Sequence, residues 1–225
     1  MTDNIYMKNY WAGFTKDMTK AMYIIRSDNK NWKLDDFLKS GTEDYNQFFL
    51  KEENSIIPDK DVILEIGCGM GRMLYATKDR FKNTYGVDID EGMIKFAKQL
   101  PPYNSERNKF IVSDGLGTID IPDNTISFVI SIICFQHMPY KDIQLKYISE
   151  IERILKPNGI AKLMLQHEEW KSNREVTCGY GVGLSSTNFQ SYLTKSDIVE
   201  IIDSSGWKGD SGKRNFWIIF KKKSI

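Results

Sequence analysis

A short apolar segment followed directly by a glycine-rich turn limits the possible fold of this chain more than any other part of its sequence. Residues 62–66 read Val-Ile-Leu-Glu-Ile, and Gly67, Gly69 and Gly71 follow them. An apolar run bounded by turn residues is typical of a buried strand in a parallel sheet. Glycines at such a turn let the backbone bend sharply and let a ligand approach the main chain. The segment therefore predicts a strand–turn–helix unit of an α/β protein, with a ligand site at the turn.

Strand and helix patterns alternate along the rest of the chain. Strands are expected at 83–88, 109–114, 126–133, 160–166 and 216–221, and helices at 72–80, 92–100, 143–155 and 196–205. This alternation predicts a mostly parallel sheet with helices on both faces. Ligands of such sheets bind beyond the carboxyl ends of the strands.

The first 55 residues differ from the rest because they contain no strand pattern and many aromatic residues. Helices are expected near residues 15–26 and 34–50, with a break at Ser40 and Gly41 as an open alternative, since glycine disfavours helix interiors. We expect residues 1–55 to form an N-terminal helical cap and residues 56–225 to form the main domain. Two interpretations of the aromatic residues stay open, packing on helix faces and a lid over a ligand site.

An acidic residue, Asp88, ends the second expected strand. An acid at this place can accept hydrogen bonds from ribose hydroxyls, so the pattern indicates an adenosine-type cofactor. Nicotinamide enzymes favour the spacing GxGxxG, whereas here the third glycine comes one position early and Arg72 takes its place. The turn also lacks the GxxxxGK[ST] pattern of nucleoside triphosphate sites.

Three motifs resemble those of the class I S-adenosylmethionine (SAM) dependent methyltransferases. Glu65-x-Gly67-x-Gly69-x-Gly71 resembles the first motif of that family, and Val112-Ser113-Asp114-Gly115 resembles the third. Leu155-Lys156-Pro157-Asn158-Gly159 is similar to the family's turn before the fifth strand. The resemblance runs from about Asp61 to the end of the chain. It implies a Rossmann-like, seven-stranded sheet of order 3-2-1-4-5-7-6 with the seventh strand antiparallel. Residues 216–221 are then the seventh strand, and the sixth is expected near 207–210.

The resemblance also implies a cofactor, S-adenosylmethionine, with S-adenosylhomocysteine as the product. In the family the glycine loop lies under the methionine part, and the acid that matches Asp88 binds the ribose. The acid that matches Asp114 takes the adenine amino group, and Ile89 and Met93 flank the ring. The full set of expected cofactor-binding residues is Glu65, Gly67, Cys68, Gly69, Gly71, Asp88, Ile89, Met93, Asp114, Gly115 and Ile132.

Two histidines are candidates for a general base. His137 follows the fourth expected strand and His167 follows the fifth, so both border the expected place of methyl transfer. Structural roles, as a hydrogen-bonding residue of the loop for His137 and as a rim residue for His167, stay open. The N-terminal cap and a glycine-containing loop at about 171–192 could close a compact pocket, which favours a small-molecule acceptor such as a metabolite or sugar-derived precursor, with oxygen favoured over nitrogen as the nucleophile. A protein or nucleic-acid methyltransferase and a non-catalytic SAM-binding module are the alternatives.

Charge and cysteine content narrow the class of protein further. Lys and Arg number 31 and Asp and Glu number 30, a balance that disfavours a general nucleic-acid binder. The 3 cysteines are far apart and contain no CxxC pair, so a disulfide framework or zinc site is not expected. The sequence also shows no cluster of carboxylates that would indicate a site for another metal ion. No apolar run approaches the roughly 20 residues that a membrane span needs, and we expect a cytoplasmic protein.

Overall fold

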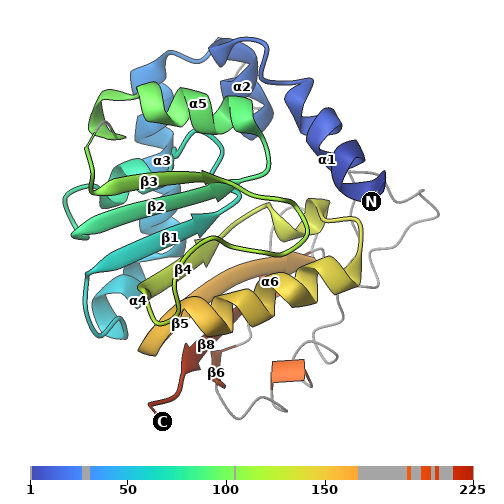
Figure 1. Ribbon diagram of the computed structural model, residues 1–225. Coiled ribbons are helices and arrows are strands. Elements are labelled where there is room, and N and C mark those ends of the chain that lie inside the picture. Colours follow the sequence, from blue (N-terminus) through green and yellow to red (C-terminus); the bar gives the residue numbers. More distant parts are fainter. Residues whose placement is uncertain are drawn as a thin grey trace. The chain divides into compact units, whose positions relative to one another are not determined.

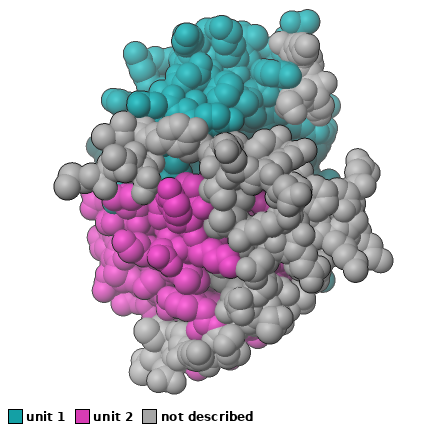
Figure 2. Space-filling view, turned by 90° about the vertical axis from the view of Figure 1, so that its right-hand side faces the viewer, with its two compact units in different colours: residues 1–115 teal, residues 116–225 magenta. Residues whose placement is uncertain are grey.

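The computed structural model describes residues 2–26, 31–103, 105–166, 192–193, 199–203, 206–207 and 215–224 (Figure 1). The chain forms two compact units, residues 1–115 and residues 116–225, which Figure 2 shows in different colours.

The first unit combines helices and parallel strands. Its helices are α1 (Thr2–Ala12), α2 (Met18–Ile25), α3 (Leu34–Phe48), α4 (Leu50–Ser55) and α5 (Glu91–Gln99). Its strands are β1 (Val62–Ile66), β2 (Asn83–Asp88) and β3 (Asn108–Val112), and its two 3₁₀ turns are η1 (Leu74–Thr77) and η2 (Pro101–Tyr103). Asp side chains start two of the helices. Asp17 accepts a hydrogen bond from the Lys20 N–H at 2.8 Å, and Asp90 caps α5, as expected of N-cap residues.

The described part of the second unit contains four parallel or antiparallel strands, a two-residue strand and a long helix. Its elements are β4 (Ile126–Ser131), η3 (Phe135–His137), α6 (Lys141–Ile154), β5 (Leu155–Gln166), β6 (Val199–Asp203), β7 (Gly206–Trp207) and β8 (Asn215–Lys222). The side chains of β4 are all buried, as the continuous apolar sequence predicts for a strand covered on both faces.

The strand order confirms the expected topology. The strands follow the order β3-β2-β1-β4-β5-β8-β6. β1, β2 and β3 pair in parallel, as do β4 and β5, whereas β8 is antiparallel to both β5 and β6. β8 therefore takes the place of the antiparallel seventh strand in the expected Rossmann-like sheet, and β6 takes that of the sixth. β7, of two residues, pairs with β8 off this path.

Two expectations for the C-terminal region are wrong. Residues 196–205 were expected to be helical and the sixth strand was expected near 207–210, but residues 199–203 form β6 and pair with β8. Val199, Ile201 and Ile202 are β-branched, and such side chains favour strands over helices once a neighbouring strand offers hydrogen bonds. The pairing partner lies later in the chain, so local sequence could not reveal it.

The expected helix at 72–80 is also wrong, since only the 3₁₀ turn η1 is regular there. The Tyr75 N–H donates to the Gly71 carbonyl at 3.1 Å, whereas the Ala76 N–H donates to Met73 at 3.0 Å. These bonds mix α-type and 3₁₀-type spacing, so no continuous helix forms.

Helix α3 runs through Gly41 without a break, contrary to the open alternative. A Cβ on Gly41 would lie 2.1 Å from the carbonyl oxygen of Arg72 and 2.5 Å from its carbonyl carbon. Glycine at this position therefore serves close packing of α3 against the chain that follows the glycine loop, rather than a break in the helix.

The aromatic residues of the N-terminal region divide by depth. Phe37, Tyr45 and Phe49 are fully buried, whereas Trp11 and Phe14 are half-buried. The Tyr45 hydroxyl donates to Glu53 at 2.7 Å, and Lys60 pairs with the same buried carboxylate at 2.6 Å. Phe37, Tyr45 and Phe49 thus belong to the core, which supports the packing interpretation for these three residues.

The helices within the described ranges are too short or too polar for any of them to cross a bilayer. The expected cytoplasmic location stays a prediction.

Candidate functional site

The glycine loop after β1 depends on backbone angles that favour glycine. Gly67, Gly69 and Gly71 have φ angles of 74°, 52° and 79°. A side chain at these angles is strained, so the three glycines let the chain leave β1 in a tight turn. The N–H groups of Gly67 and Cys68 donate to the Val87 carbonyl at 2.8 and 3.1 Å. These two bonds join the loop to the end of β2.

Bulky neighbours pack closely against the loop. A Cβ on Gly71 would lie 3.0 Å from Tyr103 and 3.1 Å from Phe110, and the Tyr103 hydroxyl donates to the Gly71 carbonyl. A Cβ on Gly69 would lie 2.8 Å from Cδ1 of Ile25 in α2. The loop is therefore held from the β3 side and covered by α2.

Asp88 lies at the end of β2, beside the glycine loop. Its carboxylate accepts hydrogen bonds from the Gly69 N–H at 2.8 Å and from the Asp90 N–H at 2.9 Å. Burial raises the pKa of Asp88 to about 6, and the N–H donors oppose this rise. A carboxylate offers about four lone-pair directions, so these bonds leave room for a hydroxyl donor. The structure thus brings together the two sequence features that indicated an adenosine-type cofactor.

The residues after Asp88 form the start of α5. Asp90 accepts from the N–H groups of Gly92 at 2.7 Å and Met93 at 3.2 Å. Met93 is buried, and its sulfur lies 4.0 Å from the position of a Cβ on Gly69, whereas Ile89 is half-buried. Met93 therefore lies beside the glycine loop, and its expected contact with the adenine ring stays a prediction.

The segment after β3 also joins this group. The Ser113 N–H donates to the Asp88 carbonyl at 2.7 Å, and the Gly115 N–H donates to the Ser113 hydroxyl at 3.0 Å. Gly115 has a φ of 75°, and the side chain of Asp114 is half-buried. The carboxyl ends of β2 and β3 are thus linked by hydrogen bonds at the expected site.

Glu65, the first acid of the motif, is buried near the end of β1. Burial raises its pKa to about 8, Asp88 adds to the rise, and Arg72 opposes it. Its Oε2 atom has no hydrogen-bond partner among the described residues. The raised pKa favours the protonated carboxyl group, which can donate a hydrogen bond as well as accept one.

The remaining expected site residues belong to the second unit or lie outside the described residues. Ile132, after β4, is half-buried, and His137 ends η3. Nε2 of His137 lies 3.2 Å from the side-chain nitrogen of Gln136. His167 and most of the loop expected at 171–192 lie outside the described residues. No group of three or more His, Cys, Asp and Glu that could hold a metal ion occurs in the described part of the chain.

Several residues at the site were missed from the sequence. Thr15 and Ile25 contact the start of α5 and the glycine loop, and Arg72 pairs with Asp44 of α3 at 2.7 Å. Asp90 was missed as well, although the sequence carried a signal for it. An Asp directly before a helix is a typical N-cap, and α5 begins at Glu91. The others carry no local pattern because their partners are far away in the sequence.

Comparison with known proteins agrees with this arrangement. Residues 64–163 match the model of a methyltransferase domain. Phosphoethanolamine N-methyltransferase 2 of Caenorhabditis elegans is 25% identical over 76% of this chain and 38% of its own length. The tRNA N(3)-methylcytidine methyltransferase trm140 of Schizosaccharomyces pombe is 26% identical over 72% of this chain and 57% of its own length. The chain thus spans less than two thirds of the length of either relative.

Solved structures include proteins with a similar fold. The S-adenosylmethionine-dependent methyltransferase from Clostridium acetobutylicum aligns with a TM-score of 0.61 and 13% identity, over 90% of this chain and 96% of that chain. At this identity the likeness concerns the fold. The matching model, the sheet order and the glycine loop joined to Asp88 together identify residues 64–163 as a domain of the class I SAM-dependent methyltransferases, a family whose cofactor is S-adenosylmethionine.

Proposed function

We propose that the protein transfers the methyl group of SAM to an oxygen atom of a small-molecule acceptor, such as a metabolite or a sugar-derived precursor. The observation that carries the cofactor half of this proposal is the hydrogen bond from the Gly69 N–H to Asp88. This bond joins the glycine loop to the acid at the end of the second strand, two motifs that the family uses together to bind the cofactor.

The residues present fit the cofactor. The ionised Asp88 would accept from the ribose hydroxyls, and Met93 would pack against the adenine ring. At Gly67, Gly69 and Gly71 the loop carries no side chain of its own that would block the methionine part. SAM supplies an electrophilic methyl carbon on a sulfonium, so the protein's main task is to hold acceptor and cofactor close together and exclude water.

The preference for a small acceptor rests on the N-terminal helices. Ile25 of α2 lies against Gly69, so the loop is covered by the chain itself. A covered site suits an acceptor that can be enclosed, whereas a macromolecule needs an open surface. The tRNA methyltransferase among the relatives favours the second candidate, a nucleic-acid acceptor.

An acceptor assay separates these candidates. The protein would be incubated with methyl-labelled SAM and three acceptor pools, namely small metabolites, total tRNA and unmodified protein. We expect label in the metabolite pool. Label in tRNA or protein would overturn the choice of acceptor while keeping the activity, and no S-adenosylhomocysteine with any pool would favour the non-catalytic SAM-binding module.

His137 is our first candidate for the general base and His167 the second. The loop that carries His137 is fixed by the buried Gln144, whose amide donates to the carbonyls of Phe135 and Met138 at 3.1 and 3.3 Å. The contact with Gln136 further limits rotation of the His137 ring. A fixed ring next to the end of β4 is suited to accept a proton from a hydroxyl acceptor.

Replacing His137 by Gln is expected to lower kcat by about 10²–10⁴-fold, the usual contribution of a general base. The Kd for SAM should stay unchanged because His137 is not among the expected cofactor contacts. His167→Gln, measured in the same turnover assay, serves as the comparison. If both variants turn over within a few-fold of the wild type, neither histidine is the base.

SAM binding should weaken as the pH falls through about 6. Below the pKa of Asp88, about 6, the carboxyl group is protonated and loses its capacity to accept from two hydroxyls. Above that pH the ionised form is present and affinity should level off. Calorimetric titrations from pH 5 to 7.5 measure this dependence.

The Asp88→Asn variant is the control for that titration. An amide cannot ionise, so its weaker binding should be independent of pH over the same range. A slope that persists in the variant would assign the effect to another group.

A further inference from the structure

The first tie between the N-terminal helices and the cofactor site is a hydrogen bond of Thr15. This residue lies between α1 and α2, and its hydroxyl lies 3.2 Å from both oxygens of Asp90. Asp90 is buried and caps α5, two residues after Asp88. A Cβ on Gly92 would lie 2.4 Å from the Thr15 hydroxyl, so only glycine at that position lets Thr15 come so close.

The second tie is an ion-pair group at the other end of α2. Arg26, the residue after α2, and Arg72, the residue after Gly71, each place an Nη1 atom 2.7 Å from the same carboxylate oxygen of Asp44. Arg72 also donates to the Ser40 hydroxyl at 3.2 Å. One carboxylate of α3 thus connects the end of α2 with the end of the glycine loop.

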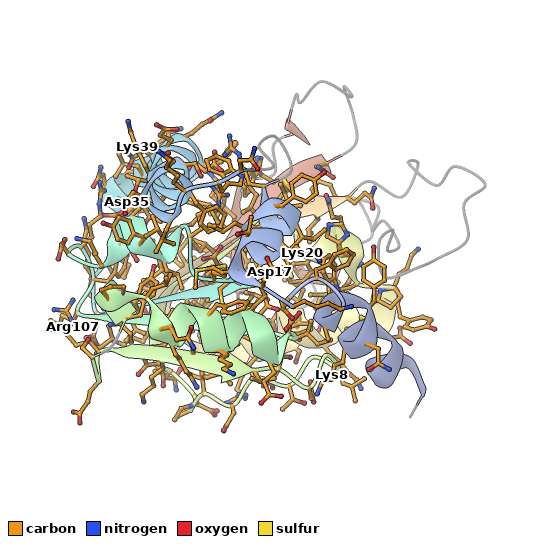
Figure 3. The ribbon with its side chains drawn as sticks, turned by 90° about the horizontal axis from the view of Figure 1, so that it is seen from above. Lys8, Asp17, Lys20, Asp35, Lys39 and Arg107 are labelled. Carbon is orange, nitrogen blue, oxygen red and sulfur yellow. The ribbon has the colours of Figure 1, made fainter. Side chains whose placement is uncertain are left out.

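Between these two ties, α2 covers the loop with apolar side chains. Ala21 and Met22 are buried, and Ile25 lies against Gly69. The opposite side of α2 is charged, since Asp17 and Lys20 pair at 3.9 Å with most of their side chains exposed. Seen from above, α2 lies between α3 and α5, with Asp17 and Lys20 at its surface (Figure 3).

From this arrangement we infer that residues 2–26, the lid segment, form a gate for the cofactor, held shut by the Thr15–Asp90 hydrogen bond and the Arg26–Asp44–Arg72 ion pairs. Gly69, which α2 covers, belongs to the loop that is expected to lie under the methionine part of SAM. The cofactor can then leave only after these contacts open. A single hydrogen bond contributes little free energy, so the lid segment can open often enough for the cofactor to exchange. The contacts still slow the release of the cofactor. The inference rests on the proposed cofactor site.

The test is the rate at which S-adenosylhomocysteine dissociates, measured by stopped-flow displacement with excess SAM. Thr15→Val keeps the shape of the side chain and removes its hydrogen bond. We expect dissociation about three- to tenfold faster than in the wild type, the effect of one hydrogen bond. Thr19→Val is the matched control, because it removes an exposed hydroxyl from α2 without touching either tie.

Hydrogen exchange of the unliganded protein provides a second readout. Thr15→Val should raise amide exchange in residues 13–26 and leave α6 unchanged, whereas Thr19→Val should leave both unchanged. Equal dissociation rates and equal exchange in the two variants would overturn the lid. A wild-type protein that binds no S-adenosylhomocysteine would instead refute the proposed function, and the exchange measurement would still decide whether Thr15 holds the segment.

Discussion

Replacing Asp88 by Ala should weaken SAM binding by about a hundredfold, which corresponds to about 3 kcal/mol. The variant would lose the proposed acceptor for the ribose hydroxyls and also the carboxylate that accepts from the Gly69 N–H. The fold should survive, because burial already disfavours the ionised form of this carboxyl group, as its raised pKa of about 6 shows. Calorimetry with SAM and S-adenosylhomocysteine measures the loss, and a thermal melt checks the fold.

Glu91→Ala is the matched control for this experiment. Glu91 is an exposed acid in the first turn of α5, three positions after Asp88, so its loss changes the net charge equally. Its SAM affinity should stay within about twofold of the wild type, since exposed charges contribute little. A folded Asp88→Ala variant that binds SAM as tightly as Glu91→Ala would show that Asp88 does not hold the ribose.

Gly41→Ala should destabilise the protein by about 3 kcal/mol, with a fall in Tm of about 6–12 °C for a chain of this size. Helix propensity alone predicts the opposite sign, because Ala is favoured over Gly by about 1 kcal/mol in a helix interior. The new Cβ would lie 2.1 Å from the backbone oxygen of Arg72, a distance that only a backbone shift can relieve. Thermal or denaturant unfolding measures the sign directly.

Glu43→Ala, an exposed change two residues along the same helix, should alter the free energy of unfolding by no more than about 0.5 kcal/mol. It controls for a general effect of alanine in α3. A Gly41→Ala protein as stable as the Glu43→Ala protein, or more stable, would mean that α3 does not pack against Arg72 as described.

Local sequence patterns were sufficient to predict the features that depend on neighbouring residues. The apolar run of β1 and the three glycines after it identified the loop, because a tight turn at these backbone angles favours glycine. The acid at the end of β2 and the first five strands also followed from local patterns, with boundaries shifted by a few residues. These signals were sufficient for the strand order and the cofactor class, because the family combines them in one fixed topology.

Features that depend on residues far apart in the chain could be seen only in the folded structure. Residues 199–203 became a strand because β8 pairs with them, although their local pattern was interpreted as helical. A break at Gly41 was an open alternative, yet this glycine lets α3 pack against Arg72. Thr15 forms a hydrogen bond with Asp90, and Asp44 forms ion pairs with Arg26 and Arg72. No sequence motif predicted these contacts. Backbone angles and apolar periodicity are set by adjacent residues, whereas strand pairing, close packing and ion pairs gain their free energy only when distant segments meet.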